Sequence, residues 1–301
     1  WGRARGGSPE ARPVLLQRAA LGFAVAAYAA LAVDASARRP RAPDPFAILM
    51  KELDARGISR VMVARDAELD TREQLSTYFG AAARRLPRDA RLSDAPADTQ
   101  AIVSALAPPR EYAAPSGVEI IRAPGAVAFV GDPARVTWGD EALAALLSGP
   151  GSSITLEAED LRGGEHGVLV EAPGDGDRDG DAPGVARAVL PGGAAIERFP
   201  LTRSPKLAVP AGDYRARFRM RGRCDGRGRE LAEVRVRVGG RAARSETVRC
   251  DGGEGASERR EDVSIDFRVR AKDRHVQLAV AYIGGAVWHD AIVIERRAPG
   301  E

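Results

Sequence analysis

The sequence predicts an α+β protein with several domains: an N-terminal transmembrane helix, a small α/β unit and a C-terminal antiparallel β-sandwich of the jelly-roll type. Three observations predict this class. Residues 14–33 form one long apolar run, apolar residues at helical spacing alternate with short apolar strands over 45–147, and a period of two dominates 152–297. We expect a flank at 1–13 and a linker at 34–44 on either side of the apolar run.

The overall charge of the chain excludes one large class of partner. Its 301 residues carry 45 Lys and Arg against 42 Asp and Glu, a formal net charge of +3. A chain with so balanced a charge has no strong field to attract nucleic acid, and we expect no nucleic-acid partner. The chain begins at Trp1 rather than Met, so we also expect it to be a fragment or a processed product.

The apolar run at 14–33, VLLQRAALGFAVAAYAALAV, is about as long as a membrane crossing requires. We expect it first to be a membrane span. A second interpretation is a signal peptide cleaved near Ala37, since Ala35-Ser36-Ala37 forms an A-x-A site. A third is a soluble, buried helix. The first two predict a membrane-anchored or secreted protein whose later residues lie outside the cytoplasm.

The segment 45–147 is predicted to be a compact α/β layer. An amphipathic helix that Gly57 ends is followed by the strand ISRVMVA, and a capping box opens a second helix. We expect a third helix at 98–107 and strands near 117–122 and 126–130. The apolar residues that define the first two helices are Phe46, Leu49, Met50 and Leu53, and then Leu75, Tyr78, Phe79, Ala82 and Leu86.

Catalytic motifs are missing from the sequence of this layer. It has no glycine-rich dinucleotide fingerprint, no phosphate-binding loop and no nucleophile elbow. No His precedes His166, which removes the usual general base. Asp66 and Glu68 follow the first strand, where an α/β site could form, but a solvated loop is the favoured interpretation. We therefore assign no catalytic and no cofactor-binding residue.

The segment 152–297 shows the pattern of half-buried strands. YRARFRM at 214–220 alternates apolar residues with Arg, and similar alternation recurs at 234–238, 263–269 and 276–282. Such strands between Gly- and Pro-rich turns predict a sandwich or jelly roll. The outward Arg rows would suit carboxylated or phosphorylated glycans or lipid headgroups, and an ordinary solvated sheet face is the alternative.

The two cysteines flank a predicted hairpin. Cys224 precedes ELAEVRVRV, and Cys250 follows RAARSETV beyond a Gly239-Gly240 turn. The ends of a hairpin lie close together, so we expect a disulfide between Cys224 and Cys250. Two free buried thiols are the alternative.

Three stretches of this segment resemble family 6 and family 35 carbohydrate-binding modules. ITLEAED at 154–160 resembles their E-A-E-type first strand, and PAGDYRARFRMR at 210–221 resembles their central strand. WHDAIVI at 288–294 resembles their closing strand with its Asp. The resemblance implies a galactose-binding-like β-sandwich that binds a glycan and catalyses no reaction.

The resemblance also implies a calcium ion. In that family a structural calcium is held by the first-strand acids and the last-strand Asp, which correspond here to Glu157, Glu159 and Asp290. Alternation places Glu157 and Glu159 on one face, and calcium binds several hard oxygen ligands. The alternative is that both Glu side chains face water on an edge strand.

Sugar binding in such modules uses an aromatic platform. By resemblance we expect Trp288 to be the ligand-binding ring, with His289 beside it, and assign Tyr282 to the core. Aromatic residues make up only 5% of the chain, which departs from the pattern expected of a strong glycan site.

The acidic stretch GDGDRDGD at 174–181 suggests a second calcium site. Its Asp residues fit positions 1, 3 and 5 of a calcium loop, and Gly180 fits position 6. Position 12 would be Ala186, where such a loop needs a bidentate Glu. The sequence therefore favours an acidic solvated loop with at most weak calcium capture.

The whole layout resembles the extracytoplasmic C-terminal region of a polytopic family 39-like membrane glycosyltransferase that uses lipid-linked sugars. This resemblance implies a non-catalytic region whose partners are the membrane and a glycan or polysaccharide of the cell envelope. Any transferase active site would lie upstream. The alternative is a structural or adhesive cell-envelope protein whose sandwich binds protein or lipid.

Overall fold

The computed structural model describes most of the chain from Asp44 onward. The described residues are 44–67, 72–87, 90–163, 168–171, 185–187, 199–223, 230–249, 258–284 and 286–298. The apolar run at 14–33, the acidic stretch at 174–181 and both cysteines lie outside them. None of the helices in the described parts of the chain is long and apolar enough to span a membrane.

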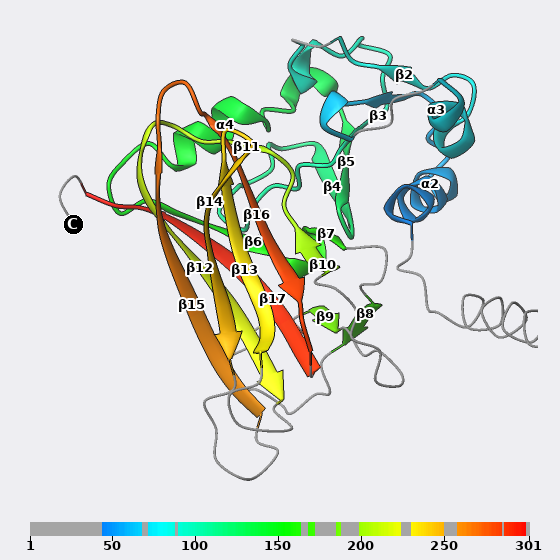
Figure 1. The fold of residues 1–301 in the computed structure, drawn as a ribbon. Helices are drawn as coiled ribbons and strands as arrows, with labels where there is room; N and C mark the ends of the chain where they lie inside the picture. The colour runs from blue at the N-terminus through cyan, green and yellow to red at the C-terminus, as the bar shows by residue number, and fades with distance from the viewer. Residues whose placement is uncertain are drawn as a thin grey trace, which may run out of the picture. The chain divides into compact units, whose positions relative to one another are not determined.

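The first part of the described chain is an α/β layer (Figure 1). Its five-stranded sheet has the order β2-β1-β3-β5-β4, with β1 parallel to β2 and β3 and the remaining pairs antiparallel. The elements are α2 (Pro45–Ala55), β1 (Val61–Val63), η1 (Arg65–Ala67), α3 (Arg72–Phe79), β2 (Arg84–Arg85), η2 (Leu92–Asp94), β3 (Ala101–Ser104), β4 (Val118–Ala123), β5 (Ala126–Gly131), η3 (Pro133–Arg135) and α4 (Asp140–Leu146), where η marks a 3₁₀ helix.

Local sequence explains where α2 and α3 begin and end. Asp44 caps α2 by accepting a hydrogen bond from the Phe46 amide at 3.0 Å, and Gly57 follows the helix with a φ of 70°. The second predicted helix is confirmed but shorter than its apolar spacing suggested. It ends at Phe79 because Gly80 takes a φ of 78°, and Leu86 lies beyond β2 instead of on the helix.

The helix predicted at 98–107 is wrong. This stretch contains β3, which lies between β1 and β5 and is buried at all four of its residues. A strand covered on both faces reads as a continuous apolar run, which spacing does not distinguish from a buried helix. The strands predicted near 117–122 and 126–130 are confirmed as β4 and β5.

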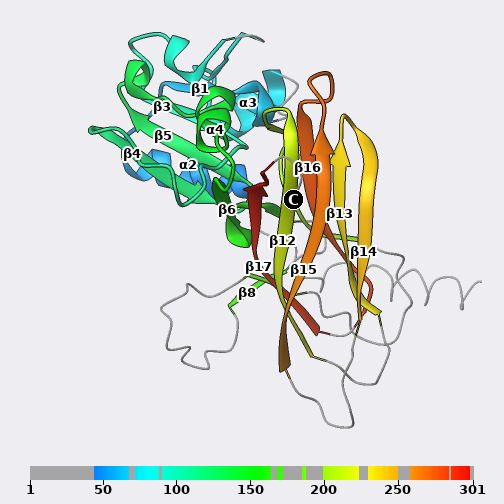
Figure 2. The ribbon, with the colours of Figure 1, turned by 90° about the vertical axis from the view of Figure 1, so that its left-hand side faces the viewer.

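The second part is a sandwich of two antiparallel sheets, as predicted (Figure 2). One sheet has the order β15-β12-β17-β6, and the other has the order β14-β13-β16-β10-β7, with β11 beside β16. The elements are β6 (Ser153–Glu157), η4 (Ala158–Asp160), β7 (Arg162–Gly163), β8 (Val168–Glu171), β9 (Val185–Arg187), β10 (Phe199–Arg203), β11 (Leu207–Ala208), β12 (Gly212–Arg223), β13 (Glu230–Val238), β14 (Arg241–Arg249), β15 (Glu258–Val269), β16 (His275–Tyr282) and β17 (Ala286–Arg296).

Alternation along the strands builds the interior of the sandwich. On β12 the side chains of Tyr214, Ala216, Phe218 and Met220 are buried, while the Arg residues between them lie on the outer face. The β13–β14 hairpin is also confirmed, with Gly239 and Gly240 at φ of 60° and 79° in its two-residue turn. The disulfide between Cys224 and Cys250 stays a prediction, because both residues lie outside the described chain.

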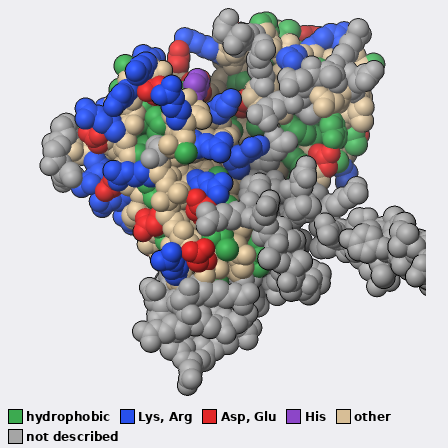
Figure 3. Space-filling view, viewed as in Figure 1, with side chains coloured by type: hydrophobic (Ala, Val, Ile, Leu, Met, Phe, Trp, Pro, Cys, Tyr) green, Lys and Arg blue, Asp and Glu red, His purple; other side chains and the backbone are tan. Residues whose placement is uncertain are grey.

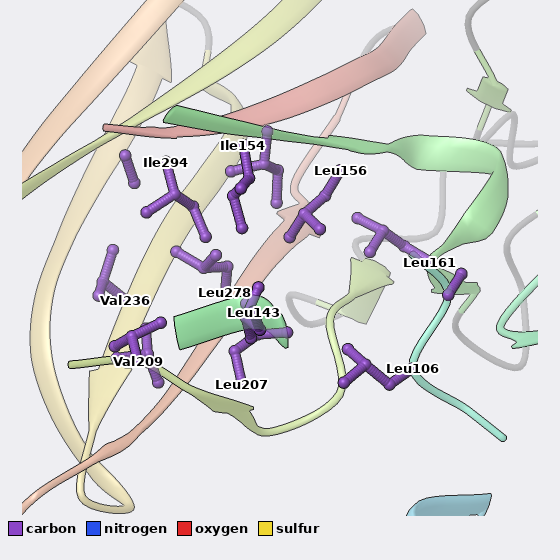
Figure 4. Packing of buried hydrophobic residues seen from close by; sticks show 14 of the residues in the cluster. Leu106, Leu143, Ile154, Leu156, Leu161, Leu207, Val209, Val236, Leu278 and Ile294 are labelled. Atoms are coloured by element: carbon purple, nitrogen blue, oxygen red, sulfur yellow. The ribbon is translucent and has the colours of Figure 1, made fainter. Parts of the chain in front are cut away.

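The layer and the sandwich share one hydrophobic core within a single compact unit, residues 41–301. Leu143 of α4 is fully buried, and in Figure 4 it lies beside Leu207 of the sandwich. The Arg296 guanidinium strengthens the junction by donating to the carbonyl oxygens of Leu147 at 3.0 Å and Ser148 at 2.6 Å, at the end of α4. We infer that the two parts support each other in folding.

Candidate functional site

The end of strand β6 brings three acids together. β6 is the edge strand of its sheet and pairs with β17, so that Glu157 lies opposite Ala291. The 3₁₀ helix η4 follows at once and carries Glu159 and Asp160. Glu157, Glu159 and Asp160 therefore lie within four consecutive residues, beside strand β17.

A β-bulge adds a fourth acid, Asp290. The pairing of β12 with β17 runs from Arg219–Ala291 to Met220–His289, so Asp290 is the extra residue on its strand. A bulge bends the strand and re-aims the side chain of the extra residue. Asp290 lies close enough to raise the pKa of both Glu157 and Glu159 by charge repulsion. We call Glu157, Glu159, Asp160 and Asp290 the carboxylate cluster.

Burial dominates the electrostatics of this cluster. It raises the pKa of Glu157 from 4.5 to about 7; Arg110 opposes that rise, and the other three acids add to it. Burial also raises the pKa of Glu159 and of Asp160, and Arg122 opposes the shift of Asp160. Four carboxyl groups in one place, two of them nearly buried, favour a cation among them.

The α/β layer supplies two of those cations. Arg110 forms an ion pair with Glu157, and Arg122 forms an ion pair with Asp160 while donating to the Pro108 carbonyl at 3.0 Å. The side chains of Glu157 and Asp160 are each only 10% exposed. The sequence had not indicated either Arg, since Arg110 lies on the loop after β3 and Arg122 on strand β4, both far from β6 in the chain.

The loop that carries Arg110 also covers the open edge of β6. Glu111 accepts hydrogen bonds from the amide and the hydroxyl of Thr155, both at 2.9 Å, and the Arg110 amide donates to the Thr155 carbonyl at 3.4 Å. An edge strand otherwise exposes unpaired backbone groups. The loop that neutralises the cluster is thus fixed to the strand that carries it.

The carboxylate oxygens of the cluster are ligands that calcium prefers, but in this structure they do not lie close enough together to hold the ion. Glu157 Oε1 and Glu159 Oε2 are buried without a hydrogen-bond partner in the described part of the chain, although Arg110 lies against the former as an ion-pair partner. Such orphaned oxygens suit a hard cation. Within the described residues, however, no three acidic, His or Cys side chains are close enough to hold a metal. The charges of Glu157, Glu159 and Asp290 act on one another, with Arg110 as the counter-charge, and their role as calcium ligands stays a prediction.

The exposed aromatic platform expected at Trp288 and His289 is wrong. Trp288 is 7% exposed and His289 is fully buried, so neither ring offers a face to a ligand. Counting back from Ile292 and Ile294 would send His289 outward, but the bulge at Asp290 shifts the alternation by one residue. The prediction failed at His289 because a bulge leaves no local sequence signal.

His289 instead links the two sheets. Its Nδ1 and the hydroxyl of Thr202 on β10 form a hydrogen bond of 2.8 Å. Burial lowers the pKa of His289 to about 3, so the ring is neutral at ordinary pH. Trp288 lies on β17, the strand that contacts β9, and its indole nitrogen has no hydrogen-bond partner among the described residues.

Asp66 is placed differently from the solvated loop that the sequence favoured. The residue is exposed, but its carboxylate accepts hydrogen bonds from the Ser104 hydroxyl at 2.6 Å and the Leu106 amide at 2.9 Å. Asp66 therefore ties the end of β1 to the end of β3, which is a structural role. Glu68 lies outside the described residues.

Comparison with known proteins gives only distant likenesses. No family model matches the chain, and no curated protein matches it. Solved structures similar to part of it include the C-terminal CBM6 of LamC, a marine laminarinase from Zobellia galactanivorans, with 16% identity over 48% of this chain and 99% of that one and a TM-score of 0.31.

Two further solved structures are similar at the same level. TmCBM61 in complex with β-1,4-galactotriose is 18% identical over 50% of this chain and 92% of that one, with a TM-score of 0.30. CBM6cm-2 from Cellvibrio mixtus lichenase 5A in complex with cellotriose is 12% identical over 48% and 97%, with a TM-score of 0.28. Identities and TM-scores this low do not assign a function to this chain, so its function has to be argued from its own residues.

Proposed function

We propose that the sandwich is a non-catalytic carbohydrate-binding region that lies outside the cytoplasm. The observation that carries the proposal is the carboxylate cluster. Glu157 and Asp290 lie on the paired strands β6 and β17, and the charge of Asp290 raises the pKa of Glu157, which supports the proposal. The two antiparallel sheets supply the rigid frame on which such a region needs to be built.

The proposal is tested by binding the whole chain to an array of neutral and charged glycans, with calcium and with a chelator. We expect binding to at least one class of glycan. Failure to bind any glycan under either condition would contradict the proposal and favour the structural or adhesive envelope protein.

We further propose that calcium binds the carboxylate cluster by replacing Arg110 as the partner of Glu157. Both cations neutralise the same buried carboxylate, so they compete. Titration calorimetry of the chain with calcium should give a binding signal that Glu159→Gln abolishes and Asp177→Asn leaves intact. The opposite pattern would move the site to the acidic stretch at 174–181.

The wider setting is proposed from the layout of the sequence. A membrane span at 14–33 ahead of the layer and the sandwich is the arrangement expected of the C-terminal region of a membrane glycosyltransferase. The gene sequence upstream of Trp1 tests this. Further apolar spans with an acidic early loop would support a transferase, while an initiator Met a few residues upstream would support a signal peptide or a simple anchor.

A further inference from the structure

The outer face of the β14-β13-β16-β10 sheet carries a cluster of arginines on a floor of small residues. Pairing aligns Arg203, Ala279, Arg235 and Ser245 in one row across the four strands. Arg237 lies on the same face, two residues along β13 from Arg235. We call Arg203, Arg235 and Arg237 around Ala279 the arginine platform.

Burial shows that these side chains point outward. The neighbours of the platform along the strands, Val234, Val236, Leu278 and Val280, are fully buried between the sheets. Alternation then places Arg235, Arg237 and Ala279 on the opposite, outer face. Figure 3 shows Lys and Arg side chains gathered over this side of the sandwich.

The spacing of the platform suits a ligand with more than one negative group. Adjacent strands lie about 5 Å apart, so the backbones of Arg203 and Arg235 are separated by about 10 Å, with Ala279 between them. Arg235 and Arg237 follow each other by about 7 Å along one strand. Because Ala279 has no long side chain, a ligand can reach the sheet between the guanidinium groups.

Two of the three arginines are available to a ligand. Arg235 is fixed by Glu233, which accepts a hydrogen bond from its Nη2 at 2.7 Å. Arg203 and Arg237 are exposed and form no ion pair with the described residues. Guanidinium groups bind carboxylate and sulfate oxygens in a bidentate manner, which makes an exposed, unpaired Arg a ready anion partner.

The composition of this face favours a glycan over a membrane or a nucleic acid. Around the arginines the outer rows hold the acid Glu233 and otherwise small or polar side chains, with no large apolar group to enter a lipid phase; the small and polar ones are Ala242, Ser245, Thr247, Gln277, Ala279 and Ala281. The net charge of the whole chain, +3, is too small to draw nucleic acid.

We propose that the arginine platform binds a linear polysaccharide that carries carboxylate or sulfate groups. The inference rests on the proposed glycan-binding function and adds to it a ligand class and a surface. It also replaces Trp288 and His289, whose rings are buried, as the place where the ligand is held.

The experiment measures binding of the whole chain to polygalacturonate, dextran sulfate and neutral dextran by affinity electrophoresis. We expect the chain to bind at least one of the two acidic polymers. The double variant Arg203→Gln/Arg237→Gln should bind about tenfold more weakly or not at all. The matched control Arg268→Gln/Arg270→Gln removes the same charge from the end of β15 in the other sheet and the residue just beyond it, where Arg268 is 76% exposed, and should bind within about twofold of the original chain.

Binding should also weaken as NaCl rises from about 50 mM to about 300 mM, because salt screens exposed charges. Equal losses in the two double variants would overturn the inference by showing a general charge effect. Binding to neutral glycans alone, unchanged in Arg203→Gln/Arg237→Gln, would overturn it while leaving the proposed function intact. Binding to phosphatidylglycerol vesicles with no binding to any glycan would overturn both. Circular dichroism checks that each variant is folded.

Discussion

The carboxylate cluster and the arginine platform each gather charges of one sign, and the protein treats them differently. Glu157 and Asp160 are nearly buried and each has an Arg from the α/β layer as its partner. Arg203 and Arg237 are exposed and have no ion-pair partner among the described residues. A charge removed from water needs a partner, while a charge left in water does not. The nearly buried acids of the cluster are therefore already neutralised by partners within the protein, whereas the arginines of the platform are available to a ligand.

The largest expected effect comes from breaking a pair in the cluster. Arg122→Ala should lower the free energy of unfolding by about 3 kcal/mol, because Asp160 would be left nearly buried without its partner. Arg203→Ala on the platform should change it by less than about 0.5 kcal/mol. Urea denaturation of the two variants checks this. Losses of similar size would remove the distinction between the two regions.

The next effect is a dependence of stability on pH that the cluster alone should cause. The pKa of Glu157 is about 7 in the folded chain and 4.5 for an ordinary Glu, so the folded state binds more protons between these values. Stability should therefore rise by about 2 kcal/mol as the pH falls from about 8 to about 5.5. Denaturation with a chelator present measures this change, and Glu157→Gln should lose most of it. A pH dependence that survives in Glu157→Gln would assign it to other groups.

Removing Arg110 should make the carboxylate cluster easier for calcium to bind, because Glu157 would lose its ion-pair partner. In Arg110→Gln, calcium at about 100 times its dissociation constant should raise the unfolding free energy by about 1 kcal/mol more than in the original chain. The control is Arg135→Gln, which removes an exposed Arg whose partner, Asp132, is also exposed. Thermal denaturation with and without calcium measures the difference. If calcium stabilises the original chain and Arg110→Gln equally, Arg110 does not compete for Glu157.

The smallest effect is expected where charges face water. Arg203→Gln/Arg237→Gln should leave the free energy of unfolding within about 0.5 kcal/mol of the original, because the change removes no ion pair that the described residues form. Urea denaturation at low salt makes the measurement. A loss of several kcal/mol would mean that the platform holds the sandwich together instead of serving a ligand.

The strands of the sandwich could be predicted because their signal is local. Tyr214 and Phe218 alternate with Arg along β12, and the Gly239-Gly240 pair marks the hairpin turn. The same local reasoning failed at β3, where both faces of the strand are covered and alternation disappears. Local reasoning also did not predict α4, the helix whose Leu143 packs into the shared core.

The candidate site could be predicted only in part. Glu157, Glu159 and Asp290 were named by resemblance as calcium ligands, a role that stays a prediction, and in the structure their charges act on one another. Arg110 and Arg122 were missed because a contact between segments far apart in the chain leaves no pattern in either segment. The place of His289 was misjudged because the bulge at Asp290 turns its side chain inward.

By itself, the sequence determined the balance of charge, the period of two that builds the sandwich, and the rows of Arg on its outer faces. These follow from neighbours in the chain, since the side chains of a strand alternate whatever it pairs with. Only the tertiary structure decided which acids lie together, which arginines neutralise them and which stay exposed. Those outcomes depend on the pairing of β17 with β6 and β12 and on the loop that carries Arg110, which join residues far apart in sequence.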